Sequence, residues 1–199
     1  MIKNIVFDLG GVVVDWNPEK IKREYTGDPQ LVSFMVDDVE LHKQWSEFDR
    51  GALSDEEIRA YIISVTGISE QLCIEVIDYV KTTLTDIPKT IDLIKELYAE
   101  GYHLFCLSNM PASFYDYLKG REVFTYFEGQ IISALELLVK PDPAIFKLAL
   151  SRYHLQPEET LFIDDLESNV RAAATLGIHT VYFGDKEKGY QLIKEALAK

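Results

Sequence analysis

The chain has 199 residues, of which 47% are hydrophobic and 27% charged, and this composition indicates a globular protein with a substantial core, not a disordered chain. Its formal net charge is −13, which argues against a nucleic-acid partner because no basic surface would replace the counterions around the phosphates. No stretch approaches the roughly 18 consecutive apolar residues of a membrane span, so we also expect no membrane partner.

Five short segments rich in β-branched and aromatic residues are expected to form strands, and helical patterns separate the later ones. The expected strands are Ile2–Leu9, Tyr102–Ser108, Gly129–Ser133, Thr160–Asp164 and His179–Phe183. The expected helices between them are Pro88–Glu100, Pro143–Tyr153 and Leu166–Leu176. This alternation predicts an α/β fold whose core is a Rossmann-like, doubly wound parallel sheet.

A helical segment interrupts the alternation after the first strand. Roughly seventy residues lie between that strand and Pro88, far more than an ordinary connection needs. Ser54 and Glu57 have the spacing of a capping box at the start of one helix. We expect four helices here, at Pro18–Tyr25, Pro29–Trp45, Ser54–Thr66 and Ser69–Leu84. The sequence thus predicts a small helical cap, residues 16–85, inserted into a core made of residues 1–15 and 86–199.

Polar residues follow the expected strands at four places. Asp8 ends the first strand, and Ser108 and Asn109 end the second. Lys140 precedes a helix, and two aspartates, Asp164 and Asp165, end the fourth strand. Ligands of open α/β sheets bind beyond the carboxyl ends of the strands, so four such features at one edge indicate a catalytic site.

These motifs resemble those of a known superfamily. Asp-x-x-Gly at residue 8, Ser-Asn at 108, Lys-Pro at 140 and Asp-Asp at 164 are similar to the four motifs of haloacid dehalogenase-like hydrolases, in the same order. The helical insertion after the first motif matches the helical cap of that superfamily. The segments DLGGVVVD and RGALSDEE look most similar to the subgroup that includes sugar phosphatases such as the glucose-1-phosphatases.

The resemblance implies a Mg²⁺-dependent phosphatase that acts on a small phosphorylated metabolite, with a sugar 1-phosphate as one candidate. It assigns Asp8 as the nucleophile that forms an aspartyl-phosphate, which splits hydrolysis into two steps. It assigns the Mg²⁺ ligands as the Asp8 carboxylate, the backbone carbonyl of Gly10 and the Asp165 carboxylate. Asp164 is then a supporting acid, with Lys140 as its expected neighbour.

The remaining motifs imply contacts to the phosphate. Lys140 neutralises the charge of the phosphate and the nucleophile. The Ser108 hydroxyl and the backbone amides of Asn109 and Met110 precede a helix expected near Pro111, and they are predicted to donate hydrogen bonds to phosphate oxygens.

Position 10 departs from the superfamily pattern. Most of its phosphatases have a second aspartate two residues after the nucleophile, which protonates the leaving oxygen and later activates water, whereas this chain has Gly10. Acid–base catalysis is typically worth about 10²–10⁴-fold. We expect a substrate with a comparatively stable leaving group, or a substitute acid among Asp15, Asp142 and His42. Asp142 is better explained as a helix cap, and His42 as a surface residue of the cap.

Two alternatives remain open because of Gly10. Haloalkanoate dehalogenases of the superfamily also lack the second aspartate, although two aspartates at 164–165 would repel an anionic substrate when no metal is bound. A catalytically weak protein that binds phosphometabolites is the other alternative.

The predicted cap should determine specificity. His42, Trp45 and Arg50 are the candidates to face the substrate, and Trp45 also fits a core position on an amphipathic helix. Hinges that open the cap are expected near Asp15 and Asp86–Pro88. Asp8 interrupts the N-terminal apolar run, so we expect no signal peptide and a cytoplasmic protein.

Overall fold

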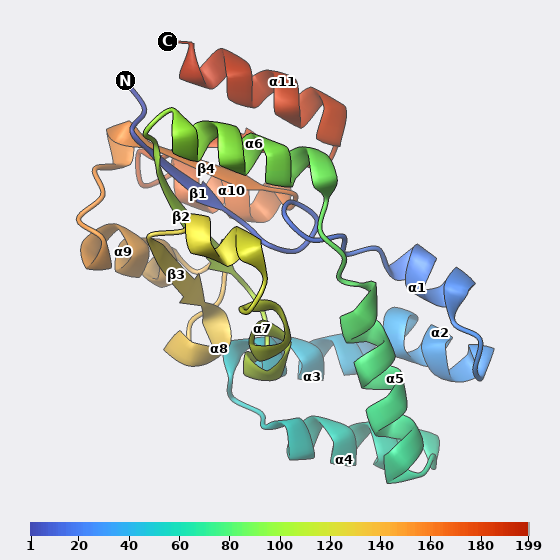
Figure 1. Cartoon of the computed structure of the whole chain (residues 1–199). Coiled ribbons are helices and arrows are strands. Elements are labelled where there is room, and N and C mark those ends of the chain that lie inside the picture. Colours follow the sequence, from blue (N-terminus) through green and yellow to red (C-terminus); the bar gives the residue numbers. More distant parts are fainter. Residues whose placement is uncertain (199) are drawn as a thin grey trace.

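The computed structural model describes residues 1–198, and in this part of the chain five parallel strands form one sheet (Figure 1). Their order is β3-β2-β1-β4-β5, so β1 is central and the chain adds strands first on one side and then on the other. The predicted Rossmann-like α/β fold is therefore confirmed. The strands are β1 (Asn4–Phe7), β2 (His103–Ser108), β3 (Gly129–Ile132), β4 (Thr160–Asp164) and β5 (His179–Tyr182).

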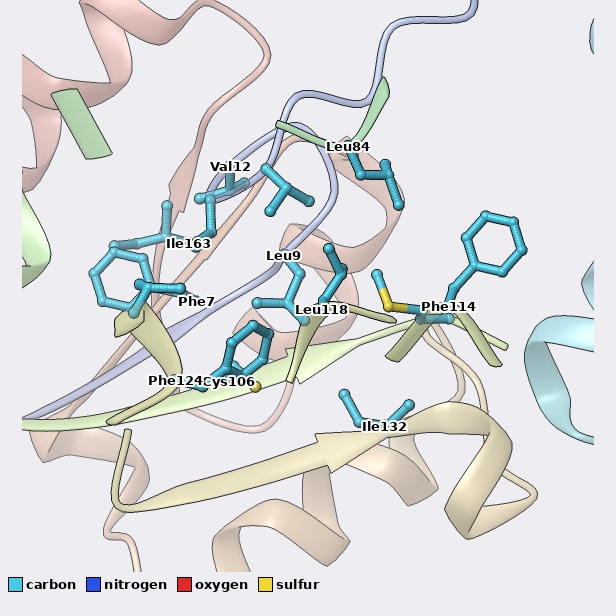
Figure 2. Packing of buried hydrophobic residues seen from close by; sticks show 14 of the residues in the cluster. Phe7, Leu9, Val12, Leu84, Cys106, Phe114, Leu118, Phe124, Ile132 and Ile163 are labelled. Atoms are coloured by element: carbon cyan, nitrogen blue, oxygen red, sulfur yellow. The ribbon is translucent and has the colours of Figure 1, made fainter. Parts of the chain in front are cut away.

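Helices cover both faces of the sheet, and alternate side chains of each strand enter two separate cores. On β1, Ile5 and Phe7 pack with α6 (Pro88–Ala99) and α11 (Lys186–Leu197). Figure 2 shows another part of this cluster, which includes Phe7, Leu9 and Ile163. Val6 points to the opposite face. That face is covered by α9 (Pro143–Arg152) and α10 (Glu167–Ala174). Both faces of β1 are buried, so a polar side chain at its end lies in a largely dry environment.

Five helices between β1 and α6 extend away from the sheet (Figure 1). We call residues 16–85 the helical insertion. Within residues 1–198, no single helix has the length and apolar composition to cross a membrane. The helices α4 and α5 together have that length and composition, but the chain bends by 115° between them. The helices are α1 (Pro18–Glu24), α2 (Pro29–Asp37), α3 (Val39–Arg50), α4 (Asp55–Thr66) and α5 (Glu70–Thr83).

The single helix expected at Pro29–Trp45 is wrong, because the structure has α2 and α3 in its place. Asp38 separates them with an extended backbone, φ −74° and ψ 122°. Its Oδ1 atom accepts a hydrogen bond from Leu41 N at 2.8 Å, which caps α3. The carboxyl half of α3 contributes Trp45, Ser46 and Asp49 to the lining of the cavity described below.

Several short elements were not predicted from the sequence. Ser133 opens a one-turn helix, whereas the sequence placed it at the end of β3. The C-terminal helix α11 was also missed. The helix expected near Pro111 is α7 (Ala112–Leu118). The unpredicted short elements are η1 (Glu122–Tyr126), α8 (Ser133–Glu136) and η2 (Pro157–Glu159).

The two chain segments that join the helical insertion to the sheet lie side by side. Asp15 N donates to Thr85 O at 2.7 Å, and Ile87 N donates to Val13 O at 2.9 Å. The insertion therefore leaves and re-enters the α/β core at one place, beside the carboxyl end of β1.

Candidate active site

Asp8 follows β1 and is held by the tight loop after it. Its backbone N–H donates to Ile163 O of β4 at 2.9 Å, and its Oδ1 accepts from Leu9 N at 2.7 Å. The carbonyl of Leu9 in turn accepts hydrogen bonds from the N–H groups of residues 12–14. Asp8 is only 7% exposed, so its carboxylate is held in one position at the edge of the sheet.

Lys140 forms ion pairs with two buried carboxylates. Its Nζ lies 2.9 Å from Asp8 Oδ1 and 2.7 Å from Asp164 Oδ2. Burial lowers the pKa of Lys140, but the charges of the two aspartates outweigh it and the net shift is upward. Lys140 therefore provides a permanent positive charge against Asp8.

Asn109 holds the main chain of Lys140. Its Oδ1 accepts from Lys140 N at 2.8 Å and its Nδ2 donates to Lys140 O at 2.9 Å. Its side chain thus positions Lys140, while Ser108 is buried at the end of β2 and lines the cavity. The Met110 amide, expected to face phosphate, instead donates to Ser133 Oγ at 2.8 Å.

Three aspartates meet at the sheet edge, with one carboxylate oxygen of each of Asp8, Asp164 and Asp165 within 4.8 Å of the others. Asp164 is fully buried and accepts hydrogen bonds from Lys140 Nζ, from Asn169 Nδ2 and from the backbone N–H of residue 166. Asp165 lines the cavity and Asp164 does not. Asn169, which the sequence analysis missed, is thus a second neighbour that fixes Asp164.

This donor set fits a divalent cation. Burial raises the pKa of Asp8 to about 7; Lys140 opposes the shift, and Asp164 and Asp165 add to it. Carboxylate oxygens are the ligands preferred by Mg²⁺, and a cation here would offset the crowded negative charge. Gly10 lines the same cavity as Asp8 and Asp165.

A cavity of about 340 Å³ lies above these residues. Its polar lining consists mainly of the residues just described, whereas its remaining wall is largely apolar. The polar group is Asp8, Gly10, Ser108, Asn109, Lys140, Asp165 and Asn169. The rest of the wall, which we call the upper wall, is Trp16, Trp45, Ser46, Asp49, Leu84, Met110, Pro111, Phe114 and Leu166.

The three residues expected to give the cap its specificity separate in the structure. Trp45 lines the cavity and makes edge-to-face contact with Phe114, another lining residue, with ring centroids 5.7 Å apart. His42 and Arg50 are exposed and are not among the described lining residues. The Nε2 atom of His42 lies 2.7 Å from a backbone carbonyl, and Arg50 pairs with Glu47 on its own helix.

The other two candidates for the acid missing at position 10 are engaged elsewhere. Asp15 forms an ion pair with Lys20 at 3.1 Å. Asp142 caps α9 by accepting from Ala144 N at 2.8 Å, as its sequence position indicated.

Asp49, at the end of α3, is the acid that the sequence analysis missed. It is partly buried in the upper wall, and burial, with a smaller contribution from the Asp8 charge, raises the pKa of its carboxyl to about 7. No local pattern marks it, because its place depends on the contact of its backbone carbonyl with Ser133, 84 residues away.

The sequence model of the haloacid dehalogenase-like hydrolase family matches residues 2–177 of the chain. The chain belongs to this family. The resemblance inferred from the four motifs is thereby confirmed, whereas the narrower likeness to glucose-1-phosphatases stays a prediction.

This haloacid dehalogenase-like hydrolase is similar to named phosphatases along nearly its whole length. It is 30% identical over 196 residues to D-ribitol-5-phosphate phosphatase of Bacteroides thetaiotaomicron, covering 90% of this chain and 91% of that protein. It is 26% identical over 186 residues to the sesquiterpene phosphatase astK of Aspergillus oryzae, covering 92% of this chain and 90% of that protein.

A solved structure shares the fold of this haloacid dehalogenase-like hydrolase. It is that of the family enzyme bt-2542 from Bacteroides thetaiotaomicron, in complex with magnesium and inorganic phosphate. The TM-score is 0.74 at 26% identity, with 92% of this chain and 94% of that chain covered.

Proposed function

We propose that this hydrolase is a Mg²⁺-dependent phosphatase that cleaves a small phosphate monoester through an aspartyl-phosphate on Asp8. The observation that carries the proposal is the fixed Asp8 carboxylate, with Lys140 Nζ at 2.9 Å and Asp165 in the same acidic cluster, at the base of the cavity. The phosphatase relatives, and the magnesium and phosphate in the solved structure, support it.

Mg²⁺ would be held by the carboxylates of Asp8 and Asp165 and by the Gly10 carbonyl. When bound, it supplies positive charge that stabilises the phosphate and the developing transition state. The formal charges then balance, because three aspartates face one lysine and a divalent ion. Asp164 keeps its hydrogen bonds to Lys140 and Asn169 and so serves to position the lysine.

The chemistry at the base of the cavity follows from these positions. One Asp8 carboxylate oxygen attacks phosphorus while Lys140 and the Ser108 hydroxyl bind the non-bridging phosphate oxygens. Because Lys140 is buried and paired, it acts through its charge and not as a proton donor.

The apolar residues of the upper wall favour a substrate with an apolar or aromatic leaving group. Apart from Ser46 and Asp49 its residues are apolar, so it offers few partners for the hydroxyls of a sugar. Unpaired hydroxyls in such a wall would lose their hydrogen bonds to water, which disfavours a polyol. The similarity to a sesquiterpene phosphatase is consistent with this class, while the D-ribitol-5-phosphate phosphatase keeps a sugar phosphate, including a sugar 1-phosphate, as the second candidate.

A substrate panel tests this proposal. We expect Mg²⁺-dependent kcat/KM to be at least about tenfold higher for phenyl phosphate and a short prenyl phosphate than for glucose 1-phosphate and ribitol 5-phosphate, as expected from burying several more apolar carbons. A preference for either sugar phosphate would contradict the apolar assignment. Chloride release from 2-chloropropionate without phosphatase activity would instead support the dehalogenase alternative.

We also propose that the helical insertion is a cap that moves to admit substrate, as its sequence position suggested. The paired connections Asp15–Thr85 and Val13–Ile87 are the hinge candidates.

Gly11→Ala is expected to weaken Mg²⁺ binding. Gly11 has a φ of 72°, and an added Cβ would lie 2.3 Å from Asp165 Oδ2, so this carboxylate must shift. Disturbing the residues that orient a metal ligand typically costs about 10–100-fold in metal affinity, which should appear as an equal rise in the Mg²⁺ concentration for half-maximal activity. Gly101→Ala is the matched control, because its φ is 89° but nothing lies near the added Cβ. An unchanged Mg²⁺ requirement in Gly11→Ala would contradict the assignment of Asp165.

A further inference from the structure

We propose that Asp49 of the helical insertion is the acid–base residue of this reaction, taking the place of the side chain that Gly10 lacks. This inference rests on the proposed phosphatase function. It assigns Asp49 to protonate the leaving oxygen and then to activate the water that hydrolyses the aspartyl-phosphate.

The direction of attack places the leaving group beside the insertion. In an in-line displacement, the leaving oxygen lies on the side of phosphorus opposite the attacking oxygen. Asp8 attacks from the base of the cavity, so the leaving oxygen faces the upper wall. Across the described part of the chain, the insertion contributes five residues to that wall, and Asp49 is the one with a carboxyl group.

The position of Asp49 is fixed by contacts between the insertion and the core. Ser133 Oγ donates to Asp49 O, and the same hydroxyl accepts from Met110 N at 2.8 Å. Gly51 lies so close to α8 that an added Cβ would be 2.3 Å from Ala134 O. Asp49 is thus anchored beside the loop that follows Ser108, in the arrangement in which it lines the same cavity as Asp8.

The Asp49 carboxylate is available for proton transfer. No hydrogen bond or ion pair of this side chain occurs among those of residues 1–198, in contrast to Asp15 and Asp142. It is close enough to Asp8 for the two negative charges to repel, yet it does not belong to the group of three aspartates that could hold a metal. A partly buried acid with a raised pKa retains a proton near neutral pH, as a general acid must.

Asp49 alone accounts for the proton in both steps of the reaction. In the first step the Asp8–phosphorus bond forms, the bond to the leaving oxygen breaks, and that oxygen takes the proton of Asp49. In the second step water attacks phosphorus and gives a proton to the Asp49 carboxylate, while the bond to Asp8 breaks and inorganic phosphate is released. Both residues return to their starting states.

Asp49→Asn should steepen the dependence of rate on leaving-group basicity. We expect kcat/KM to fall only about twofold for an aryl phosphate with an acidic phenol, such as dinitrophenyl phosphate, and about 10²–10³-fold for phenyl phosphate. Loss of the base should also slow the second step, so that dinitrophenolate appears as a burst equal to the enzyme concentration. A role in packing or substrate binding would lower all rates by one factor or change KM alone.

Glu47→Gln is the matched control, since Glu47 lies on the same helix, pairs with Arg50 and is not among the described lining residues. Its leaving-group dependence should equal that of the wild type. Asp49→Ser, a second acid-free variant, should reproduce the slope of Asp49→Asn if the latter fails to fold. An equal loss across the series in both Asp49 variants, without a burst, would overturn the inference.

The same series separates this inference from the proposed function. A wild-type protein that hydrolyses none of the esters, or an Asp8→Asn variant as active as the wild type, would contradict the proposed function itself. Hydrolysis that depends on Asp8 but shows a uniform or absent effect of Asp49→Asn would contradict only the role of Asp49.

Discussion

Asp8→Asn should lower kcat for phosphate ester hydrolysis by at least about 10⁴-fold, the range seen when a covalent nucleophile is removed. The amide oxygen of asparagine carries no charge and cannot form a stable acyl phosphate, and the substitution also removes one oxygen anion from the metal site. Release of inorganic phosphate from phenyl phosphate with Mg²⁺ measures the effect.

The fold of Asp8→Asn should be intact. Asparagine keeps the oxygen that accepts from Leu9 N, and Lys140 keeps its ion pair with Asp164. A thermal unfolding curve and a circular dichroism spectrum equal to those of the wild type would confirm that the fold is intact. A folded variant with more than about 1% of wild-type activity, well above the residual rate of an enzyme without its nucleophile, would show that Asp8 is not the attacking group. A wild-type protein as inactive as the variant would instead favour the phosphometabolite-binding alternative.

Lys140→Met should lower the free energy of unfolding by about 3–5 kcal/mol near pH 8, because it leaves Asp8 and Asp164 buried without their cation. Urea unfolding, followed by circular dichroism without divalent ions, measures this loss. The exposed Lys147, on α9, provides the control Lys147→Met, for which less than about 0.5 kcal/mol is expected.

The loss in Lys140→Met should depend on pH with a definite sign. Burial already raises the folded pKa of Asp8 above its unfolded value, and removing Lys140 removes the charge that opposes this shift. A carboxyl with a raised folded pKa stabilises the protein below its unfolded pKa, and this contribution is lost as the pH rises through the folded pKa. The difference between variant and wild type should therefore shrink as the pH falls from 8 toward 5. A difference that is equal at both pH values would contradict the buried ion pairs.

The fold and the base of the site could be predicted because their signals are local. Asp8, Ser108 and Asp165 each lie at or just beyond the end of a short, doubly buried strand, and parallel strands bring such ends to one edge. The helical periodicity between the strands then determines the layers.

The remaining features depend on choices that the local sequence leaves open. The apolar spacing of Pro29–Trp45 continues through Asp38, but the helix breaks there and the Asp38 side chain caps α3. The side chain of Asn109 holds the main chain of Lys140, 31 residues away, and no local pattern predicts this pairing. Asp49 gains its place from a contact with Ser133, 84 residues away, which no local pattern encodes.

Acid quenching of the enzyme during turnover of dinitrophenyl phosphate with Mg²⁺, followed by peptide mass spectrometry, tests the central claim most directly. The account predicts one added phosphoryl group on the peptide that contains Asp8, located on that residue, increased in Asp49→Asn and absent in Asp8→Asn. Rapid turnover with no phosphorylated peptide, or with the phosphoryl group on another residue, would contradict it.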